Sequence, residues 1–460
     1  DGAVRGLSVP VEGEMSSGGA LAINRRCVPI SIVQARYGAF SIERTQQTLC
    51  PVGGEMLAMG GPGGLKGGAD VREVALVGRS GESPLRLTAD HARVVLGQTG
   101  FTMANAALAI GPDEAPVRLT AATIDGRMAK DGFAGTLDGA GGQIGTVPLI
   151  VEQGKGQWRF AKGALELNAA MTVRDSQTAA RFSPLSVPDF ALTLKDGRIG
   201  ATGTLTSPHG GAQVATVDIA HELGSGRGHA DLNVESLTFT PALQPDDLTP
   251  LTRGVVANVA ATIKGKGQIE WTGSHVTSTG TFRTENANLA AAFGPVEGLS
   301  GEIRFTDLIG MVTAPGQEVR IKSVNPGVEV RDGTVRYRLE AGQQVRIEGG
   351  GWPFSGGKLV LLPTKMDFSA DVDRYMTFRV QGLDAGAFIQ AMDLKNVSAT
   401  GIFDGLMPLI FNAKGGRVSG GVLVARQQGM PELVMPEGVL PVIPCDPARQ
   451  SGTLSYVGPM

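Results

Sequence analysis

Apolar and charged residues alternate on both sides of an Asp-Gly step between Gly327 and Leu339. Valine, tyrosine and leucine side chains alternate with glutamate and arginine, first over Val328–Arg331 and then over Val335–Leu339. This period of two is typical of a strand with one buried face and one solvated face. Asp-Gly suits a two-residue reversal, because both central residues of a type I′ turn need positive φ. The segment therefore predicts a β-hairpin that turns at Asp332-Gly333.

The same alternation recurs through most of the chain. It is clearest in five further runs: Leu165–Val173, Leu192–Ala201, Leu299–Phe305, Val345–Ile347 and Phe378–Val380. Asp-Gly steps punctuate the sequence and predict turns at Asp125, Asp131, Asp138, Asp196, Asp332 and Asp404. The pattern predicts an all-β fold, a long, curved, mostly antiparallel sheet with one apolar face and very few short helices.

Helical periodicity is confined to Leu383–Leu394, where Asp384 can cap the first turn and Phe388 lies on an apolar face. We expect this helix to cover part of the apolar face of the sheet. The Pro-rich segment Pro241–Pro250 predicts a seam between an N-terminal part, residues 1–250, and a C-terminal part, residues 251–460, of one continuous sheet. Because the chain starts at Asp1 and stops in a strand-like pattern, we expect a segment of a longer protein.

Composition narrows the classes of partner. Glycine accounts for 67 of 460 residues, about twice the usual share of roughly 7 %, and sheets bend at glycines and bulges. The net charge of −3 argues against nucleic acid, because phosphate binding needs a concentrated basic surface. No run approaches the roughly 18–20 apolar residues of a membrane-spanning helix.

The three cysteines are Cys27, Cys50 and Cys445. A disulfide between Cys27 and Cys50 would close a loop and contribute about 3 kcal/mol, which favours an oxidising compartment. The alternative is a pair of buried free thiols. Cys445 lies among prolines and is interpreted as a loop thiol.

Sequence motifs for catalysis are missing. Lys66 in the Gly-rich segment Gly60–Gly68 is followed by glycines, not by Ser or Thr, so this is no P-loop. Ile144 stands where a dinucleotide fingerprint that begins at Gly139 would need its third glycine. The five histidines show neither i, i+4 pairing nor a CxxC partner. We expect no enzyme activity, no metal and no cofactor, although paired carboxylates could still meet in three dimensions.

Several phrases carry a resemblance to a known family. They are Cys27–Ile30, Leu49–Pro51, Phe305–Leu308, Thr313–Gln317, Val324–Val328, Trp352–Gly357, Ala399–Leu409, Gly420–Leu423 and Ser451–Tyr456. Together they resemble the YdbH family, within the AsmA-like group of Gram-negative envelope proteins. The phrases cover residues 300–460 well and the cysteine segment less fully.

The resemblance implies a β-taco, an open apolar groove that conducts phospholipid between the inner and outer membranes. It implies a periplasmic protein held in the inner membrane by an N-terminal anchor, which this chain lacks, and a small outer-membrane lipoprotein that adds strands at the C-terminal end near Leu454–Tyr456. The family has also carried a label of dicarboxylate transport. The near-neutral charge and the missing membrane bundle give that label no support.

One apolar face supplies the candidate groove lining: Val328, Val330, Val335, Tyr337, Leu339, Val345, Ile347, Leu359, Leu361, Phe378 and Val380. Trp352-Pro353-Phe354 is interpreted as a plug at an end or seam. From the pattern alone, a filled core in a structural β-solenoid or adhesin-like envelope scaffold explains the same face, and the resemblance favours the groove.

Overall fold

The computed structural model describes residues 2–61, 64–96, 100–291, 293–325, 328–370, 372–392, 398–412 and 415–426. Among these residues, 29 strands form one long, open antiparallel sheet, and four short strands form a second sheet. Helical structure there is limited to α1 (Pro245–Leu248), a 3-10 turn at Pro250–Thr252, and α2 (Ala385–Ala391). The predicted all-β fold is confirmed.

The strands increase in length after the first 67 residues. The short N-terminal strands are β1 (Gly2–Arg5), β2 (Gly13–Met15), β3 (Leu21–Ile23), β4 (Val28–Ile32), β5 (Gln34–Tyr37), β6 (Phe40–Ile42), β7 (Thr45–Pro51), β8 (Leu57–Gly61) and β9 (Gly64–Lys66). The longer strands that follow are β10 (Gly68–Ser80), β11 (Ser83–Val95), β12 (Gly100–Ile110), β13 (Val117–Ala129), β14 (Gly132–Ile144), β15 (Leu149–Ala161), β16 (Ala164–Asp175), β17 (Leu185–Lys195), β18 (Arg198–Thr206), β19 (Gln213–Glu222) and β20 (Arg227–Phe239).

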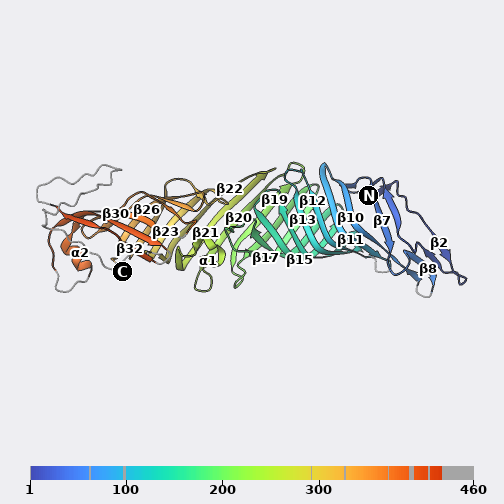
Figure 1. Ribbon diagram of the computed structural model, residues 1–460, viewed down its shortest axis with the longest axis horizontal. Helices are drawn as coiled ribbons and strands as arrows, with labels where there is room; N and C mark the ends of the chain where they lie inside the picture. Colours follow the sequence, from blue (N-terminus) through green and yellow to red (C-terminus); the bar gives the residue numbers. More distant parts are fainter. Residues whose placement is uncertain are drawn as a thin grey trace. The chain divides into compact units, whose positions relative to one another are not determined.

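The remaining strands complete the sheet. They are β21 (Val256–Thr272), β22 (His275–Ala291), β23 (Gly294–Asp307), β24 (Val312–Thr313), β25 (Gln317–Val324), β26 (Val330–Glu340), β27 (Gln344–Phe354), β28 (Gly357–Leu361), β29 (Thr364–Asp367), β30 (Arg374–Asp384), β31 (Ile402–Asn412), β32 (Gly415–Val418) and β33 (Val422–Ala425). From β10 onward the strands follow one another in chain order across the sheet (Figure 1). Neighbours in sequence are therefore neighbours in space, as the frequent turns predict.

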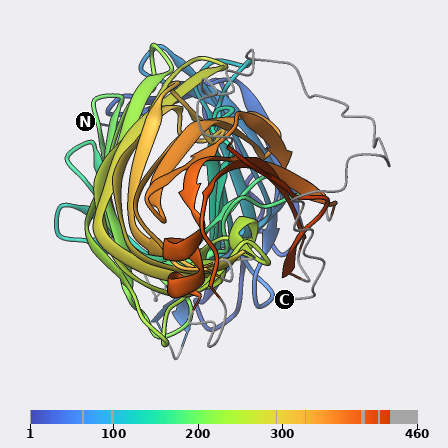
Figure 2. The ribbon, with the colours of Figure 1, turned by 90° about the vertical axis from the view of Figure 1, so that its left-hand side faces the viewer.

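The chain forms two compact units. The first contains Asp1–Glu235, Asp247–Pro250 and Lys266–Ser278, and the second contains Ser236–Asp246, Leu251–Gly265 and the chain from Thr279 onward. Strands β20, β21 and β22 contribute residues to both units. In the second unit, strands β23–β27, drawn in yellow to orange, are curved along their length (Figure 2).

The N-terminal strands cover the edge of β10. Strand β7 pairs with β10 at Ala69–Val71, and β6 pairs with it at Gly78–Ser80. A disulfide joins Cys27, just before β4, to Cys50 in β7, and β4 and β7 are themselves paired. Because exposed strand edges invite association with other chains, this arrangement protects one edge of the long sheet.

A row of kinks crosses the long strands of the first unit. Glu73, Asn105, Gly139 and Gln153 all have left-handed backbone, with φ between 49° and 61°. The pairing register of the neighbouring strands aligns three of these residues across the sheet. They are Glu73 in β10, Asn105 in β12 and Gly139 in β14. An inserted left-handed residue bends a strand and increases its twist. Bends at one level fold the sheet into a trough.

The kinks also change which residues face inward. On either side of the row, apolar residues of one face are three positions apart instead of two. Val71 and Val74, Ala89 and Ala92, and Met103 and Ala106 form such pairs, and all belong to one apolar cluster. The trough therefore keeps its apolar face on the inside through the bend.

The two rims of this trough meet through side chains. Leu85, Ile110 and Val117 lie near the rim formed by the turns after β10, β12 and β14, and they pack with Ile199 and Leu223 of the opposite rim. The hydroxyl of Thr146 donates to the carbonyl of Ser274, 2.9 Å away, and the rings of Phe40 and Phe160 are 5.7 Å apart. The sheet is open in its hydrogen bonding, yet its own side chains enclose this part of the interior.

The prediction of a turn at Asp332-Gly333 is wrong. Both residues lie inside β26, which pairs with β25 on both sides of them. Asp332 is a left-handed kink with φ 56°, and Gly333 is required because a Cβ there would lie 1.8 Å from the indole nitrogen of Trp352. The steps at Asp125, Asp138 and Asp404 also lie inside strands, whereas those at Asp131 and Asp196 are turns as predicted.

The predicted helix forms as α2. The carboxylate of Asp384 accepts a hydrogen bond from the backbone amide of Ala387 at 2.8 Å, which is the predicted cap. Predictions for Pro326, Gly327, Leu394, Cys445 and Leu454–Tyr456 lie outside the described residues.

A buried ion pair fastens the loop between β16 and β17. The carboxylate of Asp175 accepts hydrogen bonds from the guanidinium of Arg181 at 2.7 Å through two nitrogens, and its side chain is fully buried. The hydroxyl of Thr249 donates to the Arg181 carbonyl, so the pair also holds the segment that contains α1. Burial acts to raise the pKa of Asp175, but the hydrogen bonds from Arg181 and Gln177 outweigh it and lower the pKa to about 2.

Acid should lower the free energy of unfolding by protonating the Asp175 carboxylate. The pKa of Asp175 in the folded protein lies below the ordinary aspartate value of 3.8. The ionised form therefore stabilises the fold above pH ~4, and this contribution, about 2 kcal/mol, is lost as the pH falls toward ~2. We expect the stability difference between the wild type and Asp175→Asn to shrink over this range in urea titrations. A stability difference that stays constant between pH ~4 and ~2 would contradict the assignment.

Candidate functional site

The candidate lining residues gather in one apolar cluster of the second unit. Five are buried members of the cluster: Val330, Ile347, Leu359, Leu361 and Val380. Five are partly buried and pack against it: Val328, Val335, Tyr337, Val345 and Phe378. Leu339 is half-buried and is not a member of this cluster. Strands β26, β27, β28 and β30 thus present one common surface.

The cluster is larger than the sequence pattern indicated. Sequence reasoning missed ten buried members: Val296, Ile321, Val324, Trp352, Phe354, Met366, Met376, Leu383, Leu409 and Phe411. Strand register is the signal that could have found them, since Leu361 pairs with Phe378 and Val345 with Met366.

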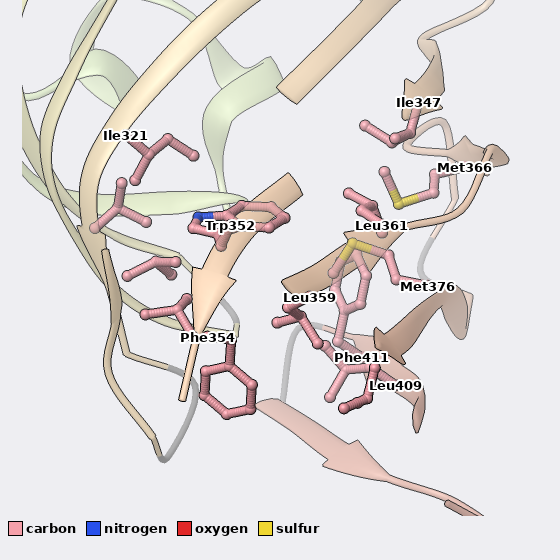
Figure 3. Close-up of a cluster of buried hydrophobic side chains, with 14 of the residues drawn as sticks. Ile321, Ile347, Trp352, Phe354, Leu359, Leu361, Met366, Met376, Leu409 and Phe411 are labelled. Atoms are coloured by element: carbon pink, nitrogen blue, oxygen red, sulfur yellow. The ribbon is translucent and has the colours of Figure 1, made fainter. Parts of the chain in front are cut away.

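The buried side chains form two facing sets. Figure 3 shows Ile321, Trp352 and Phe354 on one side and Leu361 and Met376, with their neighbours, on the other, with the side chains directed toward one another. An interior with apolar side chains on two facing sides excludes water from the apolar groups that lie between them.

Aromatic side chains join α2 to this interior. The ring of Phe354 lies 5.8 Å from the ring of Phe388 in α2, edge to face, and the ring of Trp352 lies 6.0 Å from that of Phe378. The helix therefore covers part of the apolar face, as expected. Trp352 and Phe354 belong to the main cluster, and their role as a plug stays a prediction.

The opposite face of the same strands is charged. Glu340 accepts a hydrogen bond from Arg346 at 2.7 Å and lies 3.1 Å from both Lys365 and Arg338. Hydrogen bonds from Arg346 and then Lys365 lower the pKa of Glu340 to about 2. The side chains of this network are partly exposed, between 23 % and 45 %, and they mark the solvated side of the sheet.

One lining residue carries a polar group into the interior. Burial raises the pKa of Tyr337 to about 12, so its phenol is neutral at physiological pH. A neutral hydroxyl among apolar side chains suits a carrier of amphipathic molecules, because it can hydrogen-bond without placing a charge in the interior.

The first unit has a hollow of a different character. A recess of about 640 Å³ is lined by Arg127, Ala134, Arg159 and Glu166, among others. These four are successive register partners on the polar side of β13–β16. The recess thus belongs to the solvated face, not to the apolar interior.

Within the described residues, no three or more histidine, cysteine, aspartate and glutamate side chains are grouped so that they could hold a metal ion. None of the described helices is long and apolar enough to cross a bilayer.

A long antiparallel sheet with an apolar interior and a charged outer face fits one class of protein, the bridge-like carriers that shield apolar cargo from water. A family model described as YdbH-like, intermembrane phospholipid transport protein YdbH, matches residues 7–439, and the chain belongs to this family. A search of curated proteins gave no match. The family transports lipid and is not a family of enzymes, and intermembrane transport places it in a cell envelope.

Close packing over Gly333 should be essential to this interior. In Gly333→Ala the new Cβ would lie 1.8–2.3 Å from three atoms of the Trp352 indole, which is itself buried. We expect a loss of about 2–3 kcal/mol in the free energy of unfolding, seen as a lower urea midpoint.

Gly351→Ala is the matched control, because its Cβ would meet only the Leu359 carbonyl oxygen at 3.7 Å. It should change stability by less than about 1 kcal/mol. Equal destabilisation by the two variants would show that backbone freedom matters here, and not contact with the indole.

Proposed function

We propose that this chain conducts phospholipid by holding the acyl chains against the apolar interior of its sheet. The observation that carries the proposal is the gathering of ten of the eleven candidate residues on one apolar surface, backed by a charged outer face. The membership of the chain in a phospholipid transport family supports the choice of cargo.

The free energy of a phospholipid is lower against such an interior than in free diffusion through water. A diacyl phospholipid exposes about 30 methylenes in water, at about 0.8 kcal/mol each, so its escape is opposed by more than roughly 20 kcal/mol. A continuous apolar surface replaces the bilayer around the acyl chains and leaves the headgroup near water. Because such contacts are non-directional, the lipid can slide along the surface.

We place the protein in the periplasm, held in the inner membrane by an N-terminal anchor. The disulfide between Cys27 and Cys50 supports an oxidising compartment. We further propose that the parts 1–250 and 251–460 act as two stretches of one groove.

A structural scaffold with a filled core is the second candidate. The close packing of the fifteen buried members of the apolar cluster is the observation that favours it. The two candidates differ in whether lipid can enter between the facing side chains.

Photocrosslinking separates them. A photoreactive amino acid at Tyr337 or Ile347, which lie on the apolar surface, should form adducts with phospholipid in cells, detected by mass spectrometry of the purified protein. The same amino acid at Arg336, which is exposed, should form none. Protein crosslinks alone at the two interior positions would favour the scaffold.

We also propose that a small outer-membrane lipoprotein adds strands at the C-terminal end. Strand β33 is the last described strand and pairs with β31, and a strand at the edge of a sheet can accept a further strand.

Hydrogen exchange tests this partner. Adding a soluble fragment of the lipoprotein should slow amide exchange in Val422–Ala425 and in Leu454–Tyr456. Amides of β10, whose edge is covered by β6 and β7, serve as the control and should not change. Unaltered exchange at the C-terminal end would contradict strand addition.

A further inference from the structure

The three tryptophans differ in what their indole N–H groups contact. In the first unit, Trp158 donates to the carbonyls of Asp125 and Thr136 at 3.1 and 3.2 Å, and Trp271 donates to Nδ1 of His221 at 2.9 Å. In the second unit, Nε1 of Trp352 is buried and has no acceptor among the described residues. Trp352 is nevertheless only 5 % exposed.

The position of Trp352 explains why the sheet does not satisfy its N–H. The indole lies directly over Gly333 in β26, and Gly333 and Thr334 are both register partners of β25. The ring of Phe378 lies 6.0 Å away on the other side. A buried donor without an acceptor is unfavourable and rare in native proteins. This N–H is therefore available to an acceptor that enters the interior.

We propose that the indole N–H of Trp352 binds an acyl ester carbonyl of the phospholipid cargo. This inference rests on the proposed function and adds a specific polar contact to the apolar surface. The ester carbonyl is a neutral acceptor at the junction of headgroup and acyl chains, so it can follow the chains into an apolar interior. A phosphate would have to lose its hydration there, and one neutral donor compensates poorly for a buried charge.

Flexible side chains opposite Trp352 allow an ester carbonyl to enter the interior. Nε1 of Trp352 is buried, so the carbonyl reaches it only when the two facing sets of side chains separate (Figure 3). Met366 and Met376 belong to the set that faces Trp352. Methionine is unbranched and repacks readily, which allows an acyl chain to take the place of side-chain contacts.

The test uses a pair of lipids that differ only in the proposed acceptor. A diacyl phosphoethanolamine has two ester carbonyls, and its dialkyl ether analogue of equal chain length has none. The full chain should bind the diacyl lipid about three- to tenfold more tightly than the ether lipid, the range expected for one hydrogen bond. Trp352→Phe keeps an aromatic ring but loses the N–H, and should bind both lipids equally.

Trp271→Phe is the matched control, because the N–H of Trp271 already has an acceptor in His221. This variant should retain the preference for the diacyl lipid.

In wild-type protein labelled with ¹⁵N-indole, one of the three indole signals should shift with the diacyl lipid only. This readout does not require a folded variant. Binding of both lipids with no preference, or an equal loss of both in Trp352→Phe, would overturn the inference and leave lipid transport intact. Binding of neither lipid by the wild type would overturn the proposed function itself.

Discussion

Successive side chains of a strand point to opposite faces of its sheet, and this constraint organises both units of the protein. It allows one face to be apolar and the other charged over any number of strands, without a closed core. In the second unit the result is visible on strands β26 and β27, where Tyr337 and Ile347 face the apolar cluster. Arg338 and Arg346, which are adjacent to them in the chain, join the outer charge network around Glu340. The fold can therefore grow in length while it keeps one chemical character along its interior.

The sequence showed where strands lie better than where they bend. Alternation over Leu165–Val173 and Leu299–Phe305 predicted β16 and β23, but it gave no sign of the register shifts that lie within both stretches. The Asp-Gly step was ambiguous, because a residue with positive φ can either close a turn or bend a continuing strand. At Asp196 it closes a turn, and at Asp332 it bends β26. Only the pairing with neighbouring strands decides between the two, and pairing is not a local property.

The candidate site was predicted in part for the same reason. Val330 and Val335 belong to the apolar surface although five positions separate them, since the kink at Asp332 changes the inward-facing phase. Trp352 was identified as unusual in the sequence, but its contacts with Gly333 in β26 and Phe378 in β30 bring together three different strands. Its missing acceptor is a property of the packed interior, and no sequence pattern reports it.

The row of kinks through Glu73, Asn105 and Gly139 has an evolutionary consequence. These kinks lie on alternate strands, β10, β12 and β14, so the smallest unit that can be copied without disturbing the row is a complete hairpin. Duplication of a hairpin such as β12–β13 would lengthen the trough and preserve its cross-section. Insertion of a single residue would instead move one bend out of line and reverse the faces of half a strand. Lengths in this architecture should therefore differ between relatives by whole strand pairs.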